Sequence, residues 1–436
     1  MAARPSDETT EGRLFTLAVL ALVVGAAAGL IGAVFRIVLE RADQVRDRVI
    51  VWAHGEALWG FAAVVVAGAA AALVAAWLVR RFAPHASGSG IPHVEAVLRR
   101  EMPLAPYILL PVKFVGGVLA IGSGMALGRE GPSVQMGSSI AQFVGSVCRR
   151  TWPDLRVLMA AGAGAGLATA FNSPIAGAMF VLEELVQRFE HRIAIAALAA
   201  STTAIAVARV FLGPNPDFAV EPLLPVPPLG QPLFVVLGLI AGLLAVGYNR
   251  LLLGGIGLAE RFGRVPVELR AGLIGAAVAV VAWFAPGLVG GGDPITQATL
   301  SGSVAIAFLP VAFLVRALLG SASYAAATPG GLFAPMLVLG AQLGLLFGAW
   351  SAALFPGLGI PPQAFAVVGM AAFFTGVVRA PLTGIVLIIE MTAAFAMLLP
   401  MVGACFAAML VPTLLRDLPI YEALHQHTLK REQKKR

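Results

Sequence analysis

Charged residues are scarce in this sequence. They make up 12% of the 436 residues, about half of their share in a soluble domain, while hydrophobic residues make up 59%. This composition excludes a water-soluble enzyme or binding module and is that of an integral membrane protein. The net charge of +7 does not indicate nucleic-acid binding, because the basic residues stand in short clusters between apolar segments, as the positive-inside rule describes.

Residue patterns that hold metals or cofactors are also missing. The two cysteines, Cys148 and Cys405, lie far apart, and neither has a partner at metal or redox spacing. The histidines stand at segment edges or in the tail: His54, His85, His93, His191, His425 and His427. We therefore expect no metal and no cofactor. An intramembrane hydrolase would need a serine that faces a histidine within the membrane, so we also expect that the protein is not an enzyme.

The sequence is rich instead in long apolar runs. The first uncharged run covers residues 14–35, which is enough to cross a bilayer, and we expect the polar residues 40–48 to close this span. The runs do not alternate as the strands of a transmembrane barrel would. The sequence therefore predicts an all-α polytopic membrane protein. Further apolar runs cover residues 57–79, 104–127, 155–171, 191–212, 233–253, 273–289, 304–324 and 365–378.

The chain repeats itself. Residues 172–177 (NSPIAG) recur as residues 379–384 (RAPLTG), and a glutamate follows each glycine after the same interval, at Glu183 and Glu390. Broken apolar segments at matching places in two halves are typical of transporters whose site lies between the repeats. An odd number of crossings in each half would make the repeats inverted. We divide the chain into a cytoplasmic N-terminal segment (1–12), a first transmembrane repeat (13–212), a proline-rich connecting loop (213–232), a second repeat (233–429) and a basic cytoplasmic tail (430–436).

Glycine and proline interrupt the apolar runs at three places that each precede an apolar helix. Free N–H groups at a helix start hold anions, glycine lets the backbone approach an ion, and proline suits the first helical turn. Three such starts that converge would bind an anion without a buried cation, whereas three unrelated loops would not. The breaks consist of Gly88, Ser89, Gly90, Ile91 and Pro92; of Gly128, Arg129, Glu130, Gly131 and Pro132; and of Gly331, Leu332, Phe333, Ala334 and Pro335.

Two acids are candidates for proton transfer. Glu130 stands at a helix start, where its carboxylate can take the place of an anion and, once protonated, leave it. The alternative is an acid that only complements the helix dipole. Glu184 corresponds to Met391 in the repeat, whereas its neighbour Glu183 corresponds to Glu390. We therefore predict a structural role for Glu183 and a proton site at Glu184. The alternative is a surface pair at a helix end.

Other charges in apolar surroundings are interpreted as structural. Glu95 and Lys113 are expected to form a buried salt bridge. Arg316 and Arg379 are expected to be structural or interfacial rather than ligands.

Taken together, these motifs resemble the CLC family of chloride channels and chloride/proton exchangers. The three glycine-proline breaks match, as do residues 171–184 (FNSPIAGAMFVLEE), 379–392 (RAPLTGIVLIIEMT) and 419–421 (PIY). They occur in the family's order and cover nearly all of the chain.

The resemblance implies roles for particular residues. Ser89 and Tyr421 would place hydroxyls on a central chloride, and the backbone N–H groups of Leu332 and Phe333 would complete its site. Glu130 would be the external gating and proton glutamate. Glu184 would be the internal proton glutamate, and because channels of the family usually lack an acid there, it favours a chloride/proton antiporter over the alternative, a passive chloride channel.

The resemblance also implies a setting for the protein. We expect a homodimer of inverted repeats in the cytoplasmic (inner) membrane, surrounded by lipid, with both termini cytoplasmic and no nucleic-acid partner. Ser89 favours chloride over nitrate. His93 stands where an acid is common, which alters the cytoplasmic vestibule, and the short stretch after Tyr421 is typical of prokaryotic members.

Overall fold

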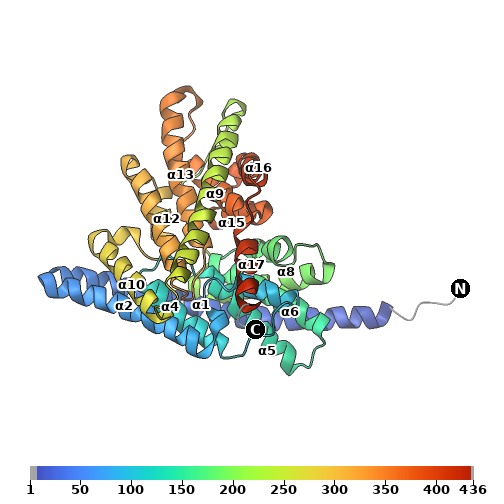
Figure 1. The fold of residues 1–436 in the computed structure, drawn as a ribbon. Coiled ribbons are helices and arrows are strands. Elements are labelled where there is room, and N and C mark those ends of the chain that lie inside the picture. Colours follow the sequence, from blue (N-terminus) through green and yellow to red (C-terminus); the bar gives the residue numbers. More distant parts are fainter. Residues whose placement is uncertain (1–6, 434–436) are drawn as a thin grey trace.

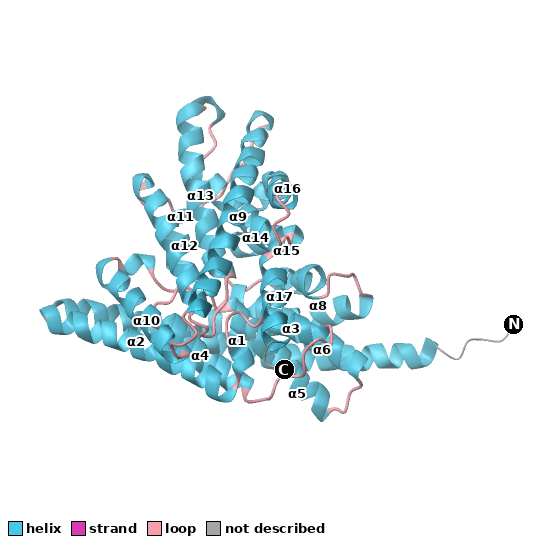
Figure 2. Ribbon diagram, viewed as in Figure 1, coloured by secondary structure: helices cyan, strands magenta, loops and turns pink. Residues whose placement is uncertain are grey.

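The computed structural model describes residues 7–433, and these residues are almost entirely helical (Figures 1 and 2). Short 3-10 turns and one π-helical turn, η2 (Val181–Leu185), join the helices, and two isolated β-bridges are the other regular backbone pairing in the described part of the chain. The α-helices are α1 (Asp7–His54), α2 (Ala57–Phe82), α3 (Ile91–Leu98), α4 (Leu109–Gly122), α5 (Glu130–Val147), α6 (Trp152–Phe171), α7 (Pro174–Phe180), α8 (His191–Leu212), α9 (Gln231–Arg261), α10 (Val267–Phe284), α11 (Asp293–Leu300), α12 (Leu309–Ala325), α13 (Phe333–Leu354), α14 (Pro362–Val378), α15 (Pro381–Thr392), α16 (Leu398–Leu414) and α17 (Ile420–Gln433).

Several helices are long and apolar enough to cross a membrane. Within residues 7–433 there are eight of these, and α4, α14 and α15 are shorter apolar helices. In Figure 1, α1 and α2 run along the bottom of the view, and α9, α12 and α13 of the second half rise above them. The predicted all-α membrane fold is confirmed. Parts of the predicted terminal segments, residues 1–6 and 434–436, lie outside the described residues.

The first helix differs from the sequence prediction. The polar residues 40–48 were expected to close the first span, but α1 continues through them to His54. No glycine or proline interrupts residues 36–54, and ion pairs at helical spacing hold this stretch, with Arg36 on Glu40 at 3.0 Å and Arg46 on Asp43 at 2.5 Å. Polarity alone therefore does not end a helix whose charges find partners one turn away.

Glycine allows α5 and α6 to pack backbone against backbone. A Cβ atom on Gly137 would lie 2.1 Å from the carbonyl oxygen of Gly162, and one on Gly166 would lie 2.1 Å from that of Ser133. Such contacts between small residues are the usual way in which membrane helices associate, because lipid offers no hydrophobic driving force. This packing fixes α5, whose first residue is Glu130, against the rest of the first half.

Gly137→Ala is expected to lower the free energy of unfolding by about 1–3 kcal/mol, because the new methyl group must push α5 away from α6. Thermal denaturation of the purified protein in detergent measures the change. Gly247→Ala is the matched control, since a Cβ atom on this glycine of α9 meets no atom within 4 Å. Equal midpoints for the two variants would contradict this account of the α5–α6 contact.

The two repeats are joined by a reciprocal exchange of carboxylates. Glu183, in η2 after α7, accepts hydrogen bonds from the N–H groups of Leu382 and Thr383 at the start of α15, at 3.0 and 2.7 Å. Glu390, near the end of α15, accepts hydrogen bonds from the N–H groups of Ile175 and Ala176 at the start of α7, at 3.1 and 2.9 Å. Each helix therefore ends where the other begins, which is the arrangement of an inverted repeat. The predicted shared structural role of Glu183 and Glu390 is confirmed.

Candidate ion-transport site

The three glycine-proline breaks meet in the structure. The N–H of Gly128 donates to the carbonyl oxygen of Gly331 at 2.9 Å, and the N–H of Gly331 donates back to that of Gly128 at 2.7 Å. Beside this pair, the N–H of Gly330 donates to the carbonyl oxygen of Gly88 at 3.1 Å. The starts of α3, α5 and α13 are thus held together by backbone hydrogen bonds, and the predicted convergence of the three helix starts is confirmed.

Glycine is required at two positions of this junction. Gly90, which precedes α3, has a φ of 84°, a left-handed conformation that other residues rarely adopt. A Cβ atom on Gly131 would lie 2.5 Å from the Ser89 hydroxyl oxygen. The glycine at 131 therefore brings the start of α5 into contact with the serine that precedes α3.

Glu130 is fully buried at this junction. Its Oε1 accepts a hydrogen bond of 2.6 Å from the backbone N–H of Phe333, the first residue of α13, and its Oε2 has no hydrogen-bond partner. The free N–H groups and the dipole of a helix start attract negative charge. The carboxylate of Glu130 therefore occupies the position that an anion at the start of α13 would take.

Two buried hydroxyl groups lie at the same junction. Ser89 and Tyr421 are both fully buried, and neither the Ser89 Oγ nor the Tyr421 Oη makes a hydrogen bond. The ring of Tyr421 lies 5.9 Å from that of Phe333, centroid to centroid. Buried hydroxyls without partners are unusual and costly. Two of them beside a helix start form a donor set suited to an anion. The family resemblance implies such a set at Ser89, Leu332, Phe333 and Tyr421, and their role as chloride ligands stays a prediction.

Lys113 supports the junction in a way that the sequence did not reveal. The predicted salt bridge between Glu95 and Lys113 is wrong: the Lys113 ammonium donates instead to the carbonyl oxygens of Gly88 at 2.7 Å and Ala86 at 3.0 Å. Glu95 pairs with Arg99 and His425. An ammonium can satisfy carbonyl oxygens as well as a carboxylate, and the turn before α3 presents two of them. The lysine was visible in its apolar run, but its backbone partners depend on the tertiary fold.

Tyr324 is another residue of the site that sequence reasoning missed. Its hydroxyl accepts a hydrogen bond of 3.4 Å from the backbone N–H of Ser89. A cavity of about 410 Å³ leads to this place and is lined in part by Gly88, Pro92, His93 and Tyr324. His93, expected to alter a vestibule, thus lies on a cavity wall. Because Tyr324 stands in an apolar helix without a motif, nothing in its local sequence indicates this contact.

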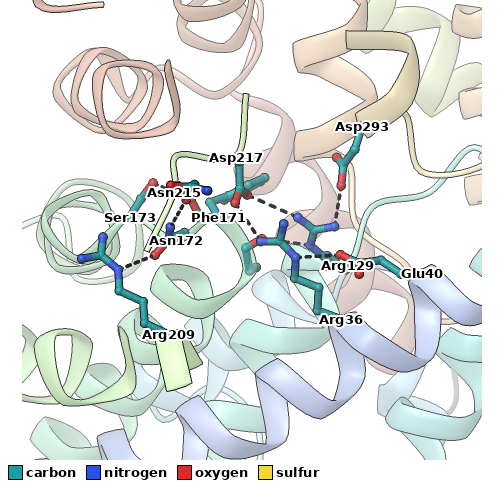
Figure 3. Close-up of polar contacts among 11 residues, drawn as sticks. Arg36, Glu40, Arg129, Phe171, Asn172, Ser173, Arg209, Asn215, Asp217 and Asp293 are labelled. Carbon is teal, nitrogen blue, oxygen red and sulfur yellow. Dashed lines mark hydrogen bonds and ion pairs between the residues drawn. The ribbon is translucent and has the colours of Figure 1, made fainter. Parts of the chain in front are cut away.

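An ion-pair network surrounds Arg129, the residue that precedes Glu130 in the chain (Figure 3). Arg129 binds Asp293 of α11 at 2.5 Å and Asp217 of the connecting loop at 3.4 Å, and it donates to the carbonyl oxygen of Ala170 at 2.9 Å. Arg36 of α1 binds the second oxygen of Asp217 at 2.7 Å. The residue next to the candidate gate therefore ties both halves and the loop between them together.

Glu184 lies in a different cluster from Glu130. Its side chain is buried, with 5% of the residue exposed. The negative charges of Glu95, Glu183 and Glu422 repel a negative charge on Glu184. The neighbouring Glu183 accepts a hydrogen bond from the start of α15, so the two adjacent acids have different surroundings. Burial of Glu184 excludes the surface pair that was its alternative interpretation.

Both arginines expected to be structural contact backbone carbonyls. Arg316 is buried and donates to the carbonyl oxygens of Leu288 and Gly290 at 3.1 and 2.9 Å. Arg379 donates to the carbonyl oxygen of Asp417 at 3.1 Å. These contacts confirm a structural role for the two side chains.

Known proteins resemble this chain over nearly its whole length. A family model described as voltage gated chloride channel matches residues 71–413. The H(+)/Cl(-) exchange transporter ClcA of Vibrio parahaemolyticus is 36% identical over 428 residues, which covers 96% of this chain and 91% of that protein. ClcA of Salmonella typhi is 36% identical over 435 residues, covering 98% and 90%.

Solved structures give the same picture. The crystal structure of a slow cyanobacterial Cl-/H+ antiporter superposes with a TM-score of 0.91 at 32% identity, and covers 95% of this chain and 98% of that one. A eukaryotic CLC transporter superposes with a TM-score of 0.81 at 23% identity, covering 96% and 74%, which supports the fold. The predicted inverted repeat of tilted and broken helices is confirmed.

Proposed function

Since this chain belongs to the voltage gated chloride channel family, also called the CLC family, we propose that it is a secondary active antiporter that exchanges chloride for protons across a membrane. The relatives just described are named exchange transporters and an antiporter, which favours exchange over a passive chloride channel. One observation carries the proposal: the Glu130 carboxylate lies on the N–H of Phe333, where a transported anion would bind.

The proposed exchange uses one site for two occupants. Chloride binds between the hydroxyls of Ser89 and Tyr421 and the backbone N–H groups of Leu332 and Phe333. The negative charge of Glu130 competes with chloride for this place. Once protonated, Glu130 loses its attraction for the helix start and yields the site. The proton on Glu130 is the one exchanged, and Glu184 passes protons from the other side. The exchange moves chloride and protons only, and no covalent bond of a substrate forms or breaks.

We further propose the setting that the family resemblance implies: a homodimer in the cytoplasmic (inner) membrane, with both termini cytoplasmic. The first repeat covers 13–212 and the second 233–429, and the reciprocal caps of α7 and α15 support this division. Exposed apolar side chains on α8 and α16, such as Leu198 and Phe406, offer faces for lipid or for a second subunit.

Reconstitution into liposomes tests the exchange. A chloride gradient is imposed, and chloride and pH electrodes follow both ions together. We expect chloride that flows down its gradient to drive protons uphill in the opposite direction. A proton gradient should likewise drive chloride uphill, against the direction in which the protons flow. Chloride flux without uphill proton movement would identify a passive channel and overturn the proposal.

Lys113→Met is expected to raise the dissociation constant of chloride about tenfold, because it leaves the carbonyl oxygens of Gly88 and Ala86 without their charged donor. These carbonyls belong to the turn that holds Ser89. Isothermal titration calorimetry with chloride measures the effect. Arg250→Met, which removes a cation whose side chain is 68% exposed, is the control and should bind chloride as the wild type does. Wild-type affinity in Lys113→Met would show that the lysine does not shape the site.

A further inference from the structure

A buried histidine on α17 lies between two carboxylates. The Nε2 of His425 lies 2.5 Å from Oε2 of Glu101, and its Nδ1 lies 3.5 Å from Oε2 of Glu95. The helices α3 and α17 that bring these groups together pack side by side (Figure 2). An imidazole with an acid at each nitrogen can accept a proton on one side and release one on the other.

Exposure falls along this row of groups. The side chain of Glu101 is 38% exposed, whereas those of His425 and Glu95 are 3% and 2% exposed. Glu95 is in turn one of the acids around the buried Glu184, and α3 packs against η2, the turn that carries Glu184. The row thus leads from solvent to the internal acid of the proposed exchange.

The charges around His425 favour its protonated form. Its contact with Glu95 raises the pKa of the imidazole above its usual value, and the charges of Glu95 and Glu101 act in the same direction against the effect of burial. Arg99 is the nearby cation: it binds Oε1 of Glu95 at 2.5 Å and lies 3.7 Å from Glu422 on α17. Because Arg99 takes Oε1, the other oxygen of Glu95 is left to face the imidazole.

We propose that His425 is a further proton-carrying residue of the exchange, which relays protons between Glu101 at the surface and Glu95 beside Glu184. This rests on the proposed function. In the inward direction Nε2 takes the proton of Glu101 and Nδ1 gives its proton to Glu95, so the ring ends as the other tautomer and Glu101 regains a proton from water. Before the next proton can pass, the neutral ring returns to its first tautomer by ring rotation and proton exchange with water, which needs no other reactant.

The relay predicts a loss of transport that depends on pH. Wild type and His425→Gln are compared in liposomes, with equal pH on both sides, from about pH 5 to about pH 8. Without the imidazole, protons reach Glu95 directly from water, and that supply shrinks as pH rises. We therefore expect proton-coupled turnover of His425→Gln to fall about tenfold at the upper end of this range and much less at the lower end. Chloride affinity, measured by calorimetry, should stay unchanged.

Two further variants make the test specific. Glu101→Gln removes the outermost acid at a half-exposed position and should show the same pH-dependent loss. His427→Gln removes another histidine of α17, which is 3.2 Å from Glu260 and outside the row, and should keep the wild-type profile.

The relay is overturned if His425→Gln loses the same fraction of its turnover at every pH, or if it behaves like His427→Gln. A wild-type protein that moves chloride without protons would overturn the exchange itself, and the relay with it.

Discussion

Glu130→Ala is expected to lower proton transport by at least about a hundredfold while chloride still crosses the membrane. The alanine removes the carboxyl group that accepts from the N–H of Phe333 at the start of α13, and it frees this N–H for chloride. Parallel recordings with chloride and pH electrodes on liposomes measure both fluxes. Chloride should then flow passively down its gradient.

Glu130→Gln separates the charge from the shape of the side chain. The amide oxygen can still accept from the N–H of Phe333, but the group can neither carry a negative charge nor exchange a proton. We expect this variant also to lose proton transport. Uphill proton movement in either variant would show that the exchanged proton does not pass through residue 130.

Glu184→Ala is expected to reduce proton coupling by at least about a hundredfold, because it removes a buried acid whose counterpart in the second repeat is Met391. Chloride binding should be retained, since the hydrogen bonds that hold the helix junction together run between backbone groups and do not involve Glu184. The proton-to-chloride ratio in liposomes measures the coupling, and calorimetry measures chloride binding. A normal ratio in Glu184→Ala would refute the role proposed for this acid.

The adjacent acid is the matched control. Glu183→Ala removes hydrogen bonds to the start of α15 and should lower the free energy of unfolding by about 1–3 kcal/mol. Its proton-to-chloride ratio should stay near that of the wild type. Glu390→Ala, which removes the mirror-image cap from α7, should cost about as much stability. If Glu183→Ala lost coupling as Glu184→Ala does, the division of roles between the two acids would be wrong.

Much of the fold was predictable because helix breaks carry a strong local signal. Glycine and proline mark the starts of α3, α5 and α13, and the spacing from each repeated glycine to its glutamate identified the pair Glu183 and Glu390. The end of α1 was not predictable from polarity, because ion pairs one turn apart keep polar residues helical.

The partners of buried charges were the least predictable part of the site. Two opposite charges in neighbouring apolar segments suggested a salt bridge, but Lys113 found carbonyl oxygens and Glu95 found Arg99 and His425. His425 is separated from Glu101 by 324 positions in the chain, so no local pattern relates them. Tyr324 likewise contacts Ser89 from a helix in the other half of the molecule. Such contacts follow from the packing of helices that are distant in the sequence, so they cannot be predicted from composition or from the spacing of residues.

The reciprocal caps of α7 and α15 bear on how a protein of this kind can arise. A single half would leave its glutamate without N–H partners and the start of its own short helix without a carboxylate. A second half, inserted into the membrane in the opposite direction, supplies both at once. The exchanged contacts are therefore those that two antiparallel copies of one duplicated unit would make. The acids at 183 and 390 are committed to that partnership, whereas the next position takes no part in it and differs between the halves, as Glu184 in one and Met391 in the other.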